Sequence, residues 1–265
     1  MKHTFKEEDL IKLLQEGKTS GDIAKIYNVD IQVIRKRVKK INLPNDICIK
    51  YRPSLEPLTQ IEIDVLIGGL LGDTWIGYSR SSKNALGSFT HKIEHSEYVD
   101  FKYNLLKRLC FLPVVHNKHD KRTGRFYQQK FCKIATNPLL NDIASKFYIN
   151  KKKTVDISYL EKLTPLGIAI WFMDDGSKTI DSYKFSTDCF SEEDRNILAN
   201  ILRKFNLECT TPQNKTIYIK KESKDNFTNL IKDYVPLCMK YKLHDLSSLK
   251  SVKRGNSIVK WTIPC

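Results

Sequence analysis

The chain has 265 residues, 41% of them hydrophobic, which is enough for one large domain or for a large and a small one. Its formal charge of +15 points to a polyanionic partner, either nucleic acid or an anionic membrane surface. No apolar run approaches the ~20 residues of a membrane-spanning helix, and the N-terminus begins no signal peptide. The composition therefore favours nucleic acid over a membrane. It predicts an intracellular protein, located in a bacterial or phage-infected cytoplasm or in an organellar matrix.

The cysteines and histidines give no sign of a conventional metal site. No C-x-x-C pair occurs, so a zinc ribbon and a disulfide framework are both disfavoured, and reduced thiols are expected. His91 and His95 have the spacing of ligands on one helix, but the sequence offers them no cysteine or carboxylate partner. The seven cysteines are Cys48, Cys110, Cys132, Cys189, Cys209, Cys238 and Cys265.

The N-terminal segment, 1–46, is predicted to form three short helices at 8–16, 20–27 and 30–41. Thr19 and Asp30 are expected to cap the last two, and Asn28 is expected to form the turn between them. This arrangement resembles a helix-turn-helix DNA-binding unit, whose second motif helix enters the major groove. A plain three-helix bundle with a solvated basic face is the alternative. The basic face of the third helix carries Arg35, Lys36, Arg37, Lys39 and Lys40.

Prolines mark 47–58 as an extended linker, and two similar apolar helices are predicted beyond it. Thr59 and Glu62 have the spacing of a capping box ahead of the first helix, and Thr164 with Pro165 starts the second. Both helices run into an aspartate, against the helix dipole, at a typical cost of a few tenths to about 1 kcal/mol. One such helix alone reads as core followed by a turn. An unfavourable aspartate at the C-terminal end of both helices indicates a functional site.

Glycines in the first apolar helix predict how the two helices pack. Gly68 and Gly72 lie on one helical face, and the matching positions of the second helix hold Ile170 and Asp174. If the bulky side chains of the second helix fit into the glycine-lined groove of the first, the helix ends, and with them Asp73 and Asp175, would lie close together. Two neighbouring carboxylates repel each other unless a cation lies between them. Oxygen ligands with an open, hydrated shell suit Mg²⁺.

The same order of elements follows each apolar helix. It predicts an α+β fold of two αββαββα halves, 59–153 and 154–250, with a pseudo-twofold axis between the apolar helices and a tail at 251–265. In the first half the strands are expected at 75–79, 88–95, 114–119 and 126–135, and the helices at 97–110 and 138–147. In the second half the strands are expected at 178–180, 183–189, 208–211 and 216–220, and the helices at 192–205 and 225–234.

The segments LIGGLLGDT (66–74) and IAIWFMDDG (168–176) resemble the two signature motifs of the LAGLIDADG homing endonucleases, in the branch with both motifs on one chain. The resemblance covers roughly 58–250, and the first motif departs from it at Gly72 and Thr74. It implies a monomeric, Mg²⁺-dependent enzyme that cuts both strands of a long, asymmetric double-stranded DNA target. The implied cut crosses the minor groove and leaves short 3′ overhangs, and the implied role is intron homing.

The candidate catalytic residues come from two arguments, the packing of the two apolar helices and the family resemblance. Asp73 and Asp175 are the expected metal ligands, because metal ions held by paired carboxylates can activate water and assist the leaving group. The resemblance adds the backbone carbonyls of Gly72 and Asp174 as ligands. It also places one lysine near each scissile phosphate, Lys153 and Lys242. A solvated run of lysines is the alternative for Lys153, which follows Lys151 and Lys152.

Strand alternation suggests which side chains face DNA. Long amide and basic side chains can pair with purine edges in the major groove, and arginines on turns can contact phosphates. The candidates on strands are Lys92, Gln128, Lys130, Lys184, Ser186, Tyr218 and Lys220, and those on turns are Arg80, Arg122, Arg125 and Lys215.

Two other functions fit the same scaffold. One is an RNA-splicing maturase, whose partner would be RNA, and the other is a non-catalytic transcription regulator. The presence of both Asp73 and Asp175 argues against the regulator and leaves the maturase open.

Overall fold

The computed structural model describes residues 6–15, 18, 20–38, 41, 55–80, 82–120, 122–150, 152–212 and 214–244. Its buried apolar side chains form two separate clusters, one in the N-terminal helices and a larger one that begins at Val65 and ends at Leu243. Most of the predicted linker, the whole predicted tail, Thr19, Lys39 and Lys40 lie outside the described residues.

The N-terminal unit contains three helices around its own core. They are α1 (Glu7–Gln15), α2 (Ser20–Ile26) and α3 (Ile31–Val38). Asn28 has a positive φ of 50°, which confirms the expected turn. The Asp30 carboxylate accepts the backbone N–H of Gln32 at 2.7 Å, as an N-cap does. The three helices are confirmed, and their identity as a helix-turn-helix unit stays a prediction.

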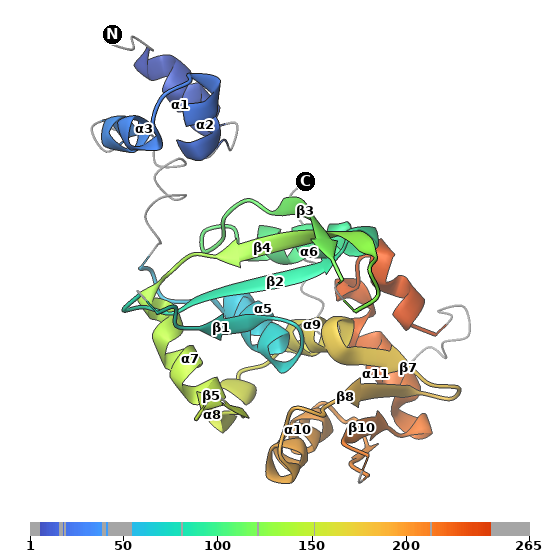
Figure 1. Ribbon diagram of the computed structural model, residues 1–265. Helices are drawn as coiled ribbons and strands as arrows, with labels where there is room; N and C mark the ends of the chain where they lie inside the picture. The colour runs from blue at the N-terminus through green and yellow to red at the C-terminus, as the bar shows by residue number, and fades with distance from the viewer. Residues whose placement is uncertain are drawn as a thin grey trace.

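The first half of the larger domain follows the expected order of elements (Figure 1). It contains α5 (Gln60–Leu71), β1 (Trp75–Gly77), β2 (Leu86–Lys92), the 3₁₀ helix η1 (Ile93–His95), α6 (Ser96–Leu105), β3 (Val114–His119), β4 (Phe126–Ile134), η2 (Pro138–Leu140), α7 (Asn141–Phe147), β5 (Tyr148–Ile149) and β6 (Lys152–Lys153).

The second half repeats that order after a short additional helix. It contains α8 (Ile157–Leu160), α9 (Pro165–Asp175), β7 (Gly176–Lys178), β8 (Tyr183–Ser186), α10 (Glu192–Lys204), β9 (Cys209–Thr210), β10 (Thr216–Ile219), η3 (Lys221–Ser223), α11 (Lys224–Ile231), η4 (Lys232–Tyr234) and η5 (Leu237–Lys242).

The duplication is visible in the two antiparallel sheets. Their strand orders are β1-β2-β4-β3 and β7-β8-β10-β9, so corresponding strands occupy corresponding positions. Phe89 pairs with Cys132 in the first sheet, and Phe185 pairs with Ile217 in the second. All four of these side chains are buried, and both halves contribute to one hydrophobic core. The predicted α+β architecture is confirmed.

The motif helices α5 and α9 lie side by side at the centre of this core (Figure 1). A Cβ atom on Gly72 would lie 2.3 Å from the Cβ of Asp174, so only glycine permits this approach. The predicted groove-and-ridge packing is thereby confirmed. The buried Asp64 of α5 also caps α9, because its carboxylate accepts the N–H of Thr164 at 2.8 Å and the Thr164 hydroxyl at 2.7 Å.

Capping residues account for the helix starts that the sequence predicted. Thr59 and Glu62 form the full capping box of α5, Thr164 accepts the N–H of Leu166 at the start of α9, and Ser191 accepts that of Asp194 in α10. The predicted ends of several helices and strands were less accurate. The strand expected at 88–95 turns into η1 after Lys92, the helix expected at 97–110 ends at Leu105, and the strand expected at 178–180 is β7, two residues earlier.

Among the described residues, the helices are all too short or too polar to span a bilayer. The five cysteines in this part of the chain, Cys110, Cys132, Cys189, Cys209 and Cys238, are free thiols, as expected. The predicted location inside a cell stays a prediction.

Candidate active site

The two candidate metal ligands lie at the C-terminal ends of the paired motif helices. Gly72 is the C-cap residue of α5, and Asp73 follows it with a side chain that is 48% exposed. Asp175 is the last residue of α9 and is half-buried. Because α5 and α9 pack side by side, the two carboxylates approach the same region. This is the arrangement expected from the sequence.

Both carboxyl groups have a raised pKa. Partial burial, then the charges of Asp73 and Asp174, raise the pKa of Asp175 to about 6. Burial and the charge of Asp174 also raise the pKa of Asp73. Clustered carboxylates of this kind are relieved by a cation, and their hard oxygen atoms suit a divalent ion such as Mg²⁺. The donor set therefore fits the metal that the sequence predicts.

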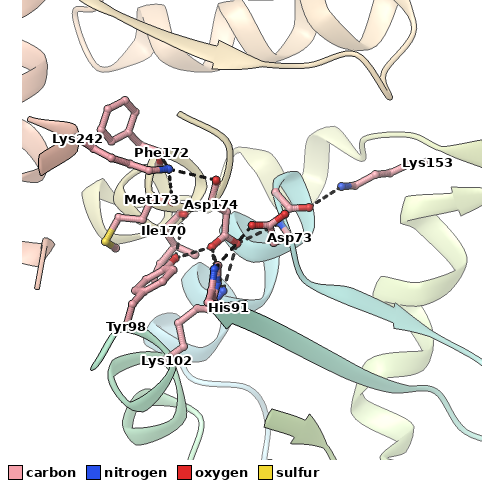
Figure 2. A network of polar contacts seen from close by, with 11 residues as sticks. Asp73, His91, Tyr98, Lys102, Lys153, Ile170, Phe172, Met173, Asp174 and Lys242 are labelled. Carbon is pink, nitrogen blue, oxygen red and sulfur yellow. Dashed lines mark hydrogen bonds and ion pairs between the residues drawn. The ribbon is translucent and has the colours of Figure 1, made fainter. Parts of the chain in front are cut away.

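The Asp174 side chain is fully buried and is held by the other half of the protein (Figure 2). Its Oδ1 accepts the hydroxyl of Tyr98 at 2.8 Å and the ammonium of Lys102 at 3.0 Å, and its Oδ2 accepts the backbone N–H of Asp73 at 3.2 Å. Burial alone would raise the pKa of Asp174, but the charges of Lys102 and His91 outweigh it and hold that pKa below its usual range.

His91, on β2 of the first half, lies close to both Asp73 and Asp174. Its Nδ1 lies 3.9 Å from Oδ2 of Asp73, and its Nε2 lies 3.4 Å from Oδ1 of Asp174. Asp73, His91 and Asp174 together offer three potential ligand atoms within 4.8 Å of one another. The expectation that His91 lacks carboxylate partners is wrong, because both partners come from distant segments. Alternation in β2 was the available signal, since Phe89, two residues earlier, faces the core.

The two candidate lysines lie at equivalent places. Lys153 of β6 donates to the carbonyl of Gly72 at 3.0 Å, and Lys242 of η5 donates to the carbonyls of Met173 at 2.5 Å and Asp174 at 3.3 Å. Each ammonium thus bonds free carbonyls at a motif-helix C-terminus, where a positive charge is favoured. Burial lowers the pKa of Lys242, against the opposing charges of the aspartates.

In the second half, the predicted DNA-facing side chains lie on the expected side of the sheet. Phe185, Ile217 and Ile219 are buried, whereas Lys184, Ser186 and Tyr218 alternate with them on the opposite face. Tyr218 lies directly across from Lys184, and its hydroxyl accepts the side-chain amide of Asn214 at 3.0 Å. Lys215 and Lys220 flank β10 and are exposed.

In the first half, the predicted orientation of Lys130 is wrong. Lys130 shares a face of β4 with the buried Cys132, and its ammonium pairs with Asp100 of α6 at 2.6 Å. It therefore points toward the helices, and Gln128 shares its face. The opposite face presents Gln129, which lies across from the exposed Lys92. The exposed Arg80 follows β1, and the exposed Arg122 and Arg125 flank the turn between β3 and β4.

The chain is similar to several characterised proteins. The LAGLIDADG DNA endonuclease family matches residues 63–227. The chain is 31% identical to the cytochrome b mRNA maturase bI2 of Saccharomyces cerevisiae over 88% of its own length, and it spans 58% of that protein. It is 29% identical to the DNA endonuclease I-ChuI of Chlamydomonas applanata over 71% of its length and 96% of the relative.

A solved structure shows the same fold. The homing endonuclease I-WcaI, bound to its DNA recognition sequence, aligns with a TM-score of 0.67 and 27% identity, over 78% of this chain and 96% of that one. The family match covers most of α5, all of α9, both four-stranded sheets and the two aspartates described above. The chain therefore belongs to the LAGLIDADG DNA endonuclease family.

Proposed function

We propose that this protein is a site-specific homing endonuclease that makes a double-strand break in a long, asymmetric DNA target by metal-dependent hydrolysis. One observation carries the proposal. Asp73 and Asp175 directly follow Gly72 and Asp174, which are in contact at the ends of two packed helices, and burial together with the charges of Asp73 and Asp174 raises the pKa of Asp175 to about 6. Maintaining such a pair is unfavourable for folding alone, and local rules broken in this way mark functional sites.

Divalent cations, Mg²⁺ in our proposal, would be held by Asp73 and Asp175 together with the backbone carbonyls of Gly72 and Asp174. When bound, they would supply activation of water and stabilisation of charge on the phosphate and the leaving oxygen. Lys153 and Lys242 would add positive charge near the two scissile phosphates. This assignment is supported by the hydrogen bonds that both ammonium groups donate to backbone carbonyls within two residues of Asp73 or Asp175.

DNA would lie along the two sheets, with one half of the protein on each half of the target. Lys184, Ser186 and Tyr218 in the second half and Lys92 in the first are exposed or half-exposed on the open faces of their strands. One chain supplies both carboxylates and both sheets, so the protein is expected to act as a monomer. The N-terminal helices would extend the contact through Arg35, Lys36 and Arg37, which are exposed on α3.

The decisive experiment compares DNA cleavage by the parent protein with that by Asp73→Asn and Asp175→Asn. The substrate is duplex DNA carrying candidate intronless sites, with Mg²⁺ or with a chelator. Parent protein with Mg²⁺ should cut both strands, and neither variant should make the double-strand break. Both variants should bind DNA at least as tightly as the parent, because repulsion from the phosphates is reduced. Asp233→Asn, an exposed change on η4, is the control.

An RNA-splicing maturase is the second candidate. The observation that favours it is the similarity to the yeast maturase bI2 over 88% of this chain. Incubation with the precursor RNA of the host intron separates the two functions. Splicing promoted by the parent and by both Asp→Asn variants, without DNA cleavage by any of them, would replace the endonuclease proposal with this one.

A further inference from the structure

The two halves of the active site are not equivalent. We propose that His91, Tyr98 and Lys102 are positioning residues that preorganise Asp73 but not Asp175, so that the two DNA strands are cut by unequal sites. This inference rests on the proposed endonuclease function. Its starting point is the buried Asp174 carboxylate, which belongs to the second half but bonds Tyr98, Lys102 and the backbone of Asp73 in the first (Figure 2).

Two contacts reach Asp73 from this network. Asp174 Oδ2 accepts the Asp73 backbone N–H at 3.2 Å and so fixes the chain at the point where α5 ends. The His91 side chain is only 8% exposed, and its Nδ1 lies 3.9 Å from the Asp73 carboxylate. The ring therefore limits the directions in which that carboxylate can turn. Lys102 and Tyr98 in turn fix Asp174, since both donate to its Oδ1.

Asp175 has no matching support. In the described part of the chain, its carboxylate has no hydrogen-bond or ion-pair partner. The residue equivalent to His91 is Thr187, which follows the buried Phe185 as His91 follows Phe89, and its hydroxyl instead donates to the carbonyl of Lys215 at 2.7 Å.

The other members of the network are also replaced in the second half. Lys102 is the seventh residue of α6, and the seventh residue of α10 is the buried, apolar Leu198. Asp174 itself corresponds to Gly72, which has no side chain to offer. The network therefore exists only once, and it acts on only one of the two candidate metal ligands.

A misplacement of about 1 Å in a catalytic group can slow a reaction by about 100-fold. Loosening the network should therefore slow the strand that is cut with the help of Asp73 more than the other strand. A merely structural ion pair would have a different effect, because general loosening of the fold slows both strands alike. The ratio of the two strand-cleavage rates distinguishes the two roles.

The test measures single-turnover cleavage of a target duplex labelled on one strand or the other, at saturating protein. The variants are His91→Gln, Tyr98→Phe and the charge-matched pair Lys102→Met with Asp174→Asn. We expect the same strand to slow about tenfold or more in each variant and the other strand to change less than about threefold, with nicked DNA accumulating. Lys204→Met, which removes the exposed ion pair with Glu161, should leave the ratio unchanged.

Equal slowing of both strands, or no slowing in folded variants, would overturn the inference and leave the endonuclease proposal standing. Tyr98→Phe removes one oxygen atom from a contact at 2.8 Å, so it keeps the test decisive if the larger changes prevent folding. A parent protein that cuts neither strand would overturn the proposed function, and the inference with it.

Discussion

Gly68 of the first motif helix packs directly against the backbone carbonyl of Gly167 in the second. A Cβ atom on Gly68 would lie 2.3 Å from that carbonyl oxygen and 3.1 Å from the Cβ of Ile170. Both distances are too short for an unstrained contact, and the nearer one involves backbone that cannot rotate away. The separation of the motif helices, and hence of Asp73 and Asp175, therefore depends on the missing side chain.

We expect Gly68→Ala to destabilise the protein by about 1–3 kcal/mol, the usual cost of overpacking a core, and Gly68→Leu to cost more. Urea unfolding measures the change, and DNA cleavage should fall with it as the helix ends separate. Gly124→Asn is the matched control. Gly124 has no neighbour within 4 Å and a φ of 69°, which asparagine tolerates. An unchanged midpoint for Gly68→Leu would contradict the packing described here.

The raised pKa of Asp175 predicts how stability depends on pH without metal. Its folded-state pKa of about 6 exceeds the ordinary 3.8, so the stability from its protonation is full below about pH 4 and lost as pH rises through 6. The Asp175→Asn variant has no titrating carboxyl group at this position, so it should not lose stability in this pH range. A shift of this size corresponds to about 3 kcal/mol for a buried group, and solvent near the half-buried carboxylate reduces it to about 1–2 kcal/mol.

We therefore expect Asp175→Asn to be more stable than the parent at pH 7.5 in a chelator and nearly equal to it at pH 4. Thermal unfolding at both pH values measures the difference. Adding Mg²⁺ should remove the advantage, because a cation stabilises the parent by binding its native state. Parallel stability profiles of the two proteins between pH 4 and 7.5 would show that the carboxylates do not repel each other in solution.

Lys92 and Lys130 provide a test of which sheet face meets DNA. Lys92 is exposed at the end of β2, whereas Lys130 pairs with Asp100 on the helix side. If Lys92 contacts a phosphate, Lys92→Ala should flatten the slope of log K against log salt by about 0.9, and Lys130→Ala should leave it unchanged. Binding titrations at several salt concentrations measure both slopes. A flatter slope for Lys130→Ala alone would reverse the assignment of faces.

Removal of the N-terminal helices should separate affinity from chemistry. The Asp73, Asp175, Lys153 and Lys242 site lies wholly within the larger domain, which has its own core. A chain that begins at Tyr51 should still cut the same bonds, bind more weakly, protect a shorter stretch of DNA and show a shallower salt slope. Footprinting and salt titration measure these effects. An unchanged footprint, or a shortened chain that no longer folds, would show that the helices are an ordinary structural subdomain.

Local signals and the repeated order of elements were sufficient to predict the α+β fold of the larger domain. Caps at Thr59, Thr164 and Ser191 and the alternation around Phe185 are properties of short segments, and each appeared in the structure as expected. Lys130 was misplaced because β3 and the outer part of β4 are exposed on both faces, so hydrophobicity does not reveal the alternation there. The four-residue helix α8 is too short to carry a periodic pattern.

The contacts of the site could not be predicted in the same way. His91 and Asp174 meet only because the two halves pack together, and no local pattern encodes a contact between such distant segments. The contact of Lys102 with Asp174 could not be predicted for the same reason. In sequence it is one basic residue on a helix, and in the structure it is fully buried against Asp174. The sequence could predict the aspartates that end the motif helices but not the groups that orient them.

The Lys102–Asp174 pair also decides which halves can associate. If two first halves met, Gly72 would stand in the place of Asp174, and Lys102 would be buried without a counter-charge. If two second halves met, two Asp174 carboxylates would face each other, and Leu198 would offer them no cation. Leaving one buried charge unpaired typically costs about 3–5 kcal/mol. Each half is therefore selective for its counterpart, which disfavours like-with-like association between neighbouring chains during synthesis.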